Sequence, residues 1–147
     1  MLAIRLVRLI ESHADKLSQG LLHKFWHSHH CGDLKKVPQA ELKDRSYEIY
    51  RNLSDWLLDK TESEIEHRYT ALGARRAAQG VAFSNLLWAL TATKEHLWEF
   101  LEAEGFVDKP AELFGELELL RSVERFFDRA QYYAAVGHER AAKSAAA

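Results

Sequence analysis

The densest group of side chains able to bind a metal ion lies in the first quarter of the chain. His23 and His27 are four residues apart, which places them on one face of a helix, and His30 or Cys31 extends that face by another turn. Imidazole nitrogens and a thiolate in such an arrangement bind zinc or another borderline-soft metal. A solvated helix end is the alternative, because histidines favour the C-terminal dipole and no second Cys or His cluster is spaced to complete a site.

Two other histidines, His67 and His96, are candidates for other kinds of site. Glu64 and His67 form a single Glu-x-x-His pair, whereas ferritin-like di-iron bundles need two such pairs and further carboxylates. An acid-rich first helical turn is the alternative explanation of this pair. His96 is a candidate haem ligand or phospho-accepting residue, although its neighbours Lys94 and Glu95 favour a boundary histidine bonded to a carboxylate.

Aromatic and charged side chains in the second half of the chain are candidates for a ligand pocket. Trp88 lies off the main apolar stripe of its expected helix, where it is available to a pocket or a partner. Arg125 and Asp128 flank two adjacent phenylalanines. If that helix is central, the two charged side chains must form ion pairs or extend to solvent. The candidate pocket residues are Trp88, His96, Trp98, Arg125 and Asp128. Core packing of the rings and a solvated stripe of charges are the alternatives.

The motifs of common enzymes are absent from the sequence. It contains no serine hydrolase elbow, no Gly-rich phosphate loop and no Cys-x-x-Cys pair. We therefore expect no catalytic residues and no enzymatic activity. The net charge of −2, with both signs interspersed along the chain, also argues against a nucleic-acid-binding surface.

Composition and periodicity predict a single all-α domain. Of the 147 residues, 47% are apolar and 29% are charged, and two prolines and seven glycines leave few places to turn. We expect a bundle of five to six helices, of which a globin-like arrangement without haem is one form. The single cysteine fits a reducing cytoplasm, and the apolar run at the N-terminus is too short to span a membrane.

The stretch between Gly80 and Gly105 is the expected central helix, because Leu86, Leu90 and Leu97 recur there at helical spacing. Capping and breaking residues set the other boundaries, among them the capping-box pair of Thr61 with Glu64 and a stop at Gly137. The other expected helices cover residues 2–11, about 14–30, 38–60, 61–80 and 110–136, with a loop at 105–110. Residues 1–137 form the expected bundle, and residues 138–147 a flexible Ala-rich tail or connector.

The N-terminal helix is the expected dimer interface. Leu2, Leu6 and Leu9 lie on one side of it, and the rest of the chain offers little to cover that apolar side. We therefore expect a homodimer.

Three segments together resemble a known family. They are LLHKFW at 21–26, the Leu-rich helix end at 52–58, and LGARRAAQGVAFSNLLWAL at 72–90. In order and residue class they resemble the N-terminal sensory domain of RsbT co-antagonist (stressosome-type) proteins, over roughly residues 17–101. The resemblance implies a non-enzymatic helical input domain that dimerises and passes a signal to a C-terminal effector. It supplies no catalytic residues and no cofactor, and the HSHHC segment at 27–31 departs from its pattern.

We therefore expect a bacterial signalling input or interaction domain in the cytoplasm. A ligand or partner would shift helix packing or dimer geometry, which requires different affinities for two arrangements. The expected partners are a second copy and either a signalling protein or a fused effector domain, with no nucleic acid and no membrane. The alternative is a metal- or haem-binding bundle that uses His23, His27 and His30, or His96.

Overall fold

The chain is helical throughout the part that the structure describes. The computed structural model describes residues 4–104 and 110–146, with side chains placed over 4–104 and 115–145. Its elements are α1 (Ile4–Ser12), α2 (Ala14–His27), the 3₁₀ segment η1 (His29–Lys36), α3 (Gln39–Arg51), the π-helical turn η2 (Asp55–Asp59), α4 (Glu62–Ala78), α5 (Phe83–Glu104) and α6 (Pro110–Ala146). The predicted all-α bundle is confirmed, with two short helical segments in addition to six α-helices. Most of the predicted loop at 105–110 lies outside the described residues.

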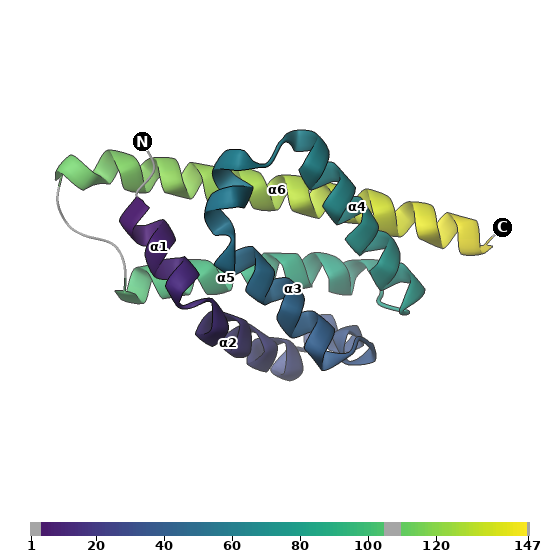
Figure 1. Cartoon of the computed structure of the whole chain (residues 1–147). Coiled ribbons are helices and arrows are strands. Elements are labelled where there is room, and N and C mark those ends of the chain that lie inside the picture. Colours follow the sequence, from purple (N-terminus) through teal and green to yellow (C-terminus); the bar gives the residue numbers. More distant parts are fainter. Residues whose placement is uncertain (1–3, 105–109, 147) are drawn as a thin grey trace.

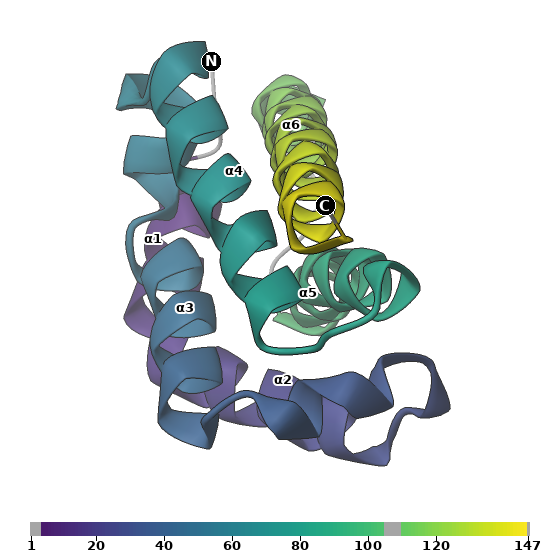
Figure 2. The ribbon, with the colours of Figure 1, turned by 90° about the vertical axis from the view of Figure 1, so that its right-hand side faces the viewer.

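Helix α5 occupies the centre of the bundle. It contacts α6 on one side and α2 with η1 on the other, while α4 lies alongside α6 (Figures 1 and 2). Its buried side carries Leu86, Leu90, Leu97 and Leu101, at the spacing that the sequence predicts for a central helix. Over the described ranges, none of the helices has an apolar stretch long enough to cross a membrane.

The predicted capping box at the start of α4 is confirmed. The backbone N–H of Glu64 donates to Thr61 Oγ1 at 3.2 Å, and the N–H of Thr61 donates to Glu64 Oε2 at 2.7 Å. The two side chains therefore satisfy donors that the first helical turn leaves without a partner. At the other end of α4 the chain turns at Gly80, which has a φ of 82°.

Helix α3 ends at Arg51, whereas the sequence predicted one helix as far as Lys60. The break is at Asn52, and two residues later the Glu11 carboxylate of α1 accepts hydrogen bonds from Ser54 N–H at 2.9 Å and Ser54 Oγ at 2.8 Å. The backbone then forms the wider π-helical turn, closed by Lys60 N–H donating to Asp55 O at 2.8 Å. A side chain distant in sequence thus binds the chain close to a break that local pattern does not predict.

Helix α6 continues through Gly137 to Ala146, so the predicted stop at Gly137 is wrong. The glycine serves close packing instead, because a Cβ on Gly137 would lie 2.0 Å from the Thr70 carbonyl oxygen of α4. The contact is reciprocal, since a Cβ on Gly73 would lie 1.9 Å from the Ala134 carbonyl oxygen of α6. The backbones of α4 and α6 therefore touch without an intervening side chain. Residues 138–146 extend the helix, and their role as a connector stays a prediction.

We predict that Gly137→Ala lowers the free energy of unfolding by about 2 kcal/mol. The overpacking penalty against α4 exceeds the gain of about 1 kcal/mol that Ala brings to a helix. Gly32→Ala is the matched control, because no atom lies within 4 Å of its added Cβ, and its effect should stay below about 0.5 kcal/mol. Urea denaturation followed by circular dichroism measures both, and equal midpoints would contradict the proposed close contact.

Candidate functional site

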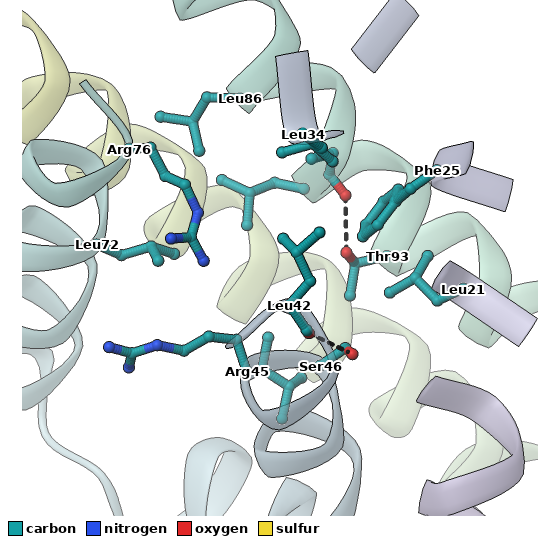
Figure 3. A pocket seen from close by; sticks show the side chains of 13 residues that line it. Leu21, Phe25, Leu34, Leu42, Arg45, Ser46, Leu72, Arg76, Leu86 and Thr93 are labelled. Carbon is teal, nitrogen blue, oxygen red and sulfur yellow. Dashed lines mark hydrogen bonds between the residues drawn. The ribbon is translucent and has the colours of Figure 1, made fainter. Parts of the chain in front are cut away.

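Five helical elements converge on one partly open pocket of about 50 Å³. Its walls come from α2, η1, α3, α4 and α5, with apolar side chains over most of the surface (Figure 3). The lining residues are Leu21, Phe25, Leu34, Leu42, Arg45, Ser46, Ile49, Leu72, Arg76, Leu86, Ala89, Leu90 and Thr93. A largely apolar pocket with a few convergent polar groups has the character of a small-molecule site.

The pocket has a basic side and an apolar side. Figure 3 shows the guanidinium groups of Arg45 and Arg76 on the same side, next to Leu72. Phe25 and Leu34 lie on the opposite side. The two arginines come from α3 and α4, so the basic side is the seam between those helices.

The buried guanidinium of Arg76, which is 3% exposed, is fixed by a hydrogen-bonded network around Glu41. Arg76 Nη1 donates to Glu41 Oε2 at 2.6 Å and to Gln79 Oε1 at 2.8 Å. Arg75 Nε donates to the other carboxylate oxygen at 2.6 Å, and Gln79 Nε2 donates to Glu41 Oε2 at 2.8 Å. These donors, the Arg75 hydrogen bond foremost, lower the pKa of Glu41 to about 2. The carboxylate therefore stays ionised and holds the Arg76 side of the pocket in place.

Arg45 differs from Arg76, because no carboxylate of the described residues lies within 4.0 Å of its guanidinium. Burial first, and then the positive charge of Arg68, lower the pKa of Arg45, while the carboxylates of Glu41 and Glu48 act in the opposite direction. The charges that act on one another at this seam are Arg45, Arg68, Arg75, Arg76, Glu41 and Glu48. Four positive and two negative charges leave a net of +2, in a chain whose own net charge is −2. Such a local excess favours an anion.

The polar groups around the pocket are unequally satisfied. Ser46 Oγ donates to Leu42 O at 2.9 Å and Thr93 Oγ1 donates to Ala89 O at 2.7 Å, each within its own helix (Figure 3). By contrast, the buried Tyr69 hydroxyl at the α3–α4 seam has no hydrogen-bond partner within the described part of the chain. Burial raises the pKa of Tyr69, so the hydroxyl keeps its proton and remains a donor. The seam thus offers cationic and hydroxyl donors but few acceptors.

The comparison with known families identifies the chain. The family model of the RsbT co-antagonist protein rsbRD N-terminal domain matches residues 26–147. The chain belongs to this family. Neither a curated protein nor a solved structure matches it. The resemblance inferred from the sequence is therefore confirmed, and the chain is a stressosome-type signalling domain. The matched region covers η1 and α3 to α6, whereas α1 and nearly all of α2 precede it.

Sequence reasoning missed the two arginines of the pocket in this rsbRD-type domain. The sequence does indicate that Arg76 is buried, because it occupies the next position on the apolar stripe of Ile65, Tyr69 and Leu72. Arg45 similarly falls one turn after Leu42, on the inner side of α3. An arginine on a buried stripe indicates either a buried ion pair or a ligand site, and the sequence does not distinguish the two.

The predicted metal cluster does not form. Helix α2 ends at His27, so the face shared by His23 and His27 does not continue to the next residues. His30 packs on Trp88 with ring centroids 4.0 Å apart, and Cys31 is buried, which raises the pKa of its thiol. Throughout the described ranges, no three His, Cys, Asp or Glu side chains are grouped to hold a metal ion.

The predicted ligand-pocket residues do not line the pocket, and the structure does not bring them together. Trp88 is 41% exposed beside η1, and Arg125 and Asp128 are exposed on α6. Trp98 Nε1 donates to Glu124 at 3.0 Å, which ties α5 to α6.

His96 lies against α2, where its Nε2 would be 2.9 Å from a Cβ on Gly20. Its Nδ1 is buried with no hydrogen-bond partner among the described residues, and burial lowers its pKa. It is therefore a neutral packing residue at the α2–α5 contact rather than part of the pocket.

The predicted dimer interface is only partly available. Leu6 is buried inside the chain together with Val7 and Ile10, so the expectation that this side lacks cover does not hold for it. Leu9 is half-buried, and Leu2 lies outside the described residues.

We predict that Glu41→Gln lowers the free energy of unfolding at pH 7 by about 1–2 kcal/mol, after allowance for solvent screening. The folded pKa of Glu41 is depressed from 4.5 to about 2, so its stabilisation is present above pH 4.5 and is lost as the pH falls towards 2. Urea denaturation at pH 7, 5 and 3.5 should show the difference between variant and original chain shrinking with pH. A difference that is constant with pH would contradict the shared-carboxylate network.

Proposed function

We propose that the chain is a non-enzymatic bacterial input domain that binds a small ligand in the pocket and relays its presence through helix packing. The supporting observation is that the pocket walls belong to five helical elements of a stressosome-type signalling domain. An occupant would therefore contact all five of these elements at once, including α4 and α5, which pack on α6. We propose that the domain acts in the cytoplasm on a signalling protein or a fused effector.

The pocket is mechanically connected to α6 through α4. The lining residues Leu72 and Arg76 lie on either side of Gly73 in sequence, the glycine whose backbone touches α6. A movement of α4 that accommodates a ligand must therefore move α6 or separate the two backbones.

Helix α5 provides a second connection to α6. Gln131 of α6 donates to Leu87 O at 3.2 Å and to Thr91 Oγ1 at 3.1 Å. The helix that carries Leu86 and Ala89 into the pocket is thus also hydrogen-bonded to α6. Both routes converge on the same element.

Helix α6 is suited to carry such a movement outward. Its 37 residues span about 55 Å, and its C-terminal turns extend past the end of α4 (Figure 1). A ligand biases this arrangement only if it binds one packing of the helices more tightly than another. We propose that these exposed turns are the output of the domain.

We also propose that the chain forms a homodimer through α1, where Ile4 is 39% exposed and Leu9 is half-buried. Light scattering should give twice the 16.9 kDa mass of one chain, and Ile4→Glu should shift the mass towards the monomer. Ser84→Glu adds the same charge at an exposed position of α5 and should leave the dimer intact. A monomeric mass for the unaltered chain at all concentrations would exclude the dimer.

We predict that Ala89→Val, which adds two methyl groups to the pocket wall, disrupts signalling without unfolding the domain. Valine at this helical position should cost about 0.5–1 kcal/mol of stability, because it is β-branched. In the producing bacterium, a transcriptional reporter of the stress response should become either unresponsive or constitutively active.

Ala103→Val is the matched control for this substitution. It makes the same change on the exposed side of α5 and should leave the reporter response as it is in the original strain. A normal response in the Ala89→Val strain, with the variant present at normal abundance, would contradict the proposal that the pocket takes part in signalling.

A further inference from the structure

The strongest unassigned feature is the guanidinium of Arg45, which lies at the α3–α4 edge of an apolar pocket and has no carboxylate of the described residues within 4.0 Å. Its helix neighbour on the wall is Ser46, whose hydroxyl is already committed to Leu42 O at 2.9 Å. Glu41 forms its ion pairs with Arg75 and Arg76, and Glu48 forms its own with Arg68, so both act on Arg45 only from beyond ion-pair distance. A partly buried, unpaired guanidinium is costly unless a ligand or solvent supplies the negative charge.

The opposite side of the pocket has no comparable polar group. It is formed by Phe25, Leu34 and Leu21, and the hydroxyl of Thr93 is bonded to its own helix (Figure 3). A bound molecule would therefore meet a positive charge at one end and hydrocarbon at the other. Inorganic anions satisfy only the first of these surfaces.

The size of the cavity limits the length of the ligand. It measures about 50 Å³, and one water molecule needs roughly 10–15 Å³ of such space, so about four water-sized groups fit. A chain of about three to five carbons fills it, and a medium-chain fatty acid does not fit without rearrangement.

We propose that the pocket binds a short-chain monocarboxylate, with its carboxylate at Arg45 and its alkyl chain between Phe25 and Leu34. The inference rests on the proposed function of this pocket as the input site. Arg45 has a free planar fork, which matches the two oxygens of a carboxylate. Arg76 contributes charge to the same side while its own hydrogen bonds remain with Glu41 and Gln79.

Butyrate is the test ligand, titrated into the isotope-labelled chain at constant ionic strength and followed by amide chemical shifts. Shifts should concentrate on residues of the pocket walls. Each buried methylene raises affinity roughly fourfold, so butyrate, with two methylenes more, should bind about fifteenfold more tightly than acetate. Octanoate should bind no more tightly than butyrate, and butanol should not compete. Equal effects of phosphate and butyrate would overturn the proposal, because they would indicate a site for the charge alone.

Arg45→Gln should weaken butyrate binding by about tenfold or more, the typical effect of losing a charged hydrogen bond. Arg51→Gln removes the same charge from an exposed position of α3 and should change affinity by less than about twofold. Unchanged binding in Arg45→Gln would overturn the assignment of the carboxylate. If Arg45→Gln does not fold, Ala89→Val decides the question, since it should abolish butyrate binding by filling the pocket.

The failure of this proposal is distinguishable from failure of the proposed function. Loss of signalling in Ala89→Val together with no butyrate binding would mean that the pocket is an input site for a different ligand. Butyrate binding that is weakened by Arg45→Gln, together with normal signalling in Ala89→Val, would mean that the proposed ligand class is right and the proposed input role is wrong.

Discussion

The direct backbone contact between α4 and α6 is the constraint on which the rest of the architecture depends. Gly73 and Gly137 bring the two helices so close that carbonyl oxygens occupy the places where side chains would start. This proximity fixes how α4 is rotated about its axis, and therefore which of its residues face α3 and α5. Leu72 and Arg76 reach the pocket because the glycine between them turns the other side of α4 towards α6. Close packing at one surface thus defines the chemistry of another.

The electrostatics at the seam between α3 and α4 follow from the same placement. Arg76 is buried where α4 meets α3, so it requires the Glu41 carboxylate, which Arg75 also holds. Because that carboxylate pairs with Arg75 and Arg76, Arg45 has no ion pair within the described residues and lies on the side of the pocket opposite Phe25 and Leu34. The pocket is therefore basic as a consequence of how the domain buries one arginine. The proposed binding of a small anion requires no group beyond this asymmetry.

Local pattern predicted what is local, namely the all-α class, the central helix and the Thr61–Glu64 capping box. It also carried the family resemblance: the segments at 52–58 and 72–90 lie within the matched region, whereas the segment at 21–26 precedes it except for Trp26. The errors concern features decided by distant residues. Gly137 is a residue type that often ends a helix, but here it allows α6 to pack closely against α4. The histidines between residues 23 and 30 do not share one face, because α2 ends at His27. The pocket forms only where five elements pack together, and no single stretch of sequence predicts that packing.

The bond between Glu11 and Ser54 has a wider consequence. It joins the first helix, which precedes the region matched by the family, to the point where α3 gives way to a π-helical turn. A tertiary contact between residues 43 positions apart in sequence therefore lies just beyond the end of α3. Members of the family with a different leading segment need not share this interruption. In such relatives the tryptophan that follows it, Trp56 here, would take another orientation against Tyr69 and Phe126, and the same core would be assembled with different geometry.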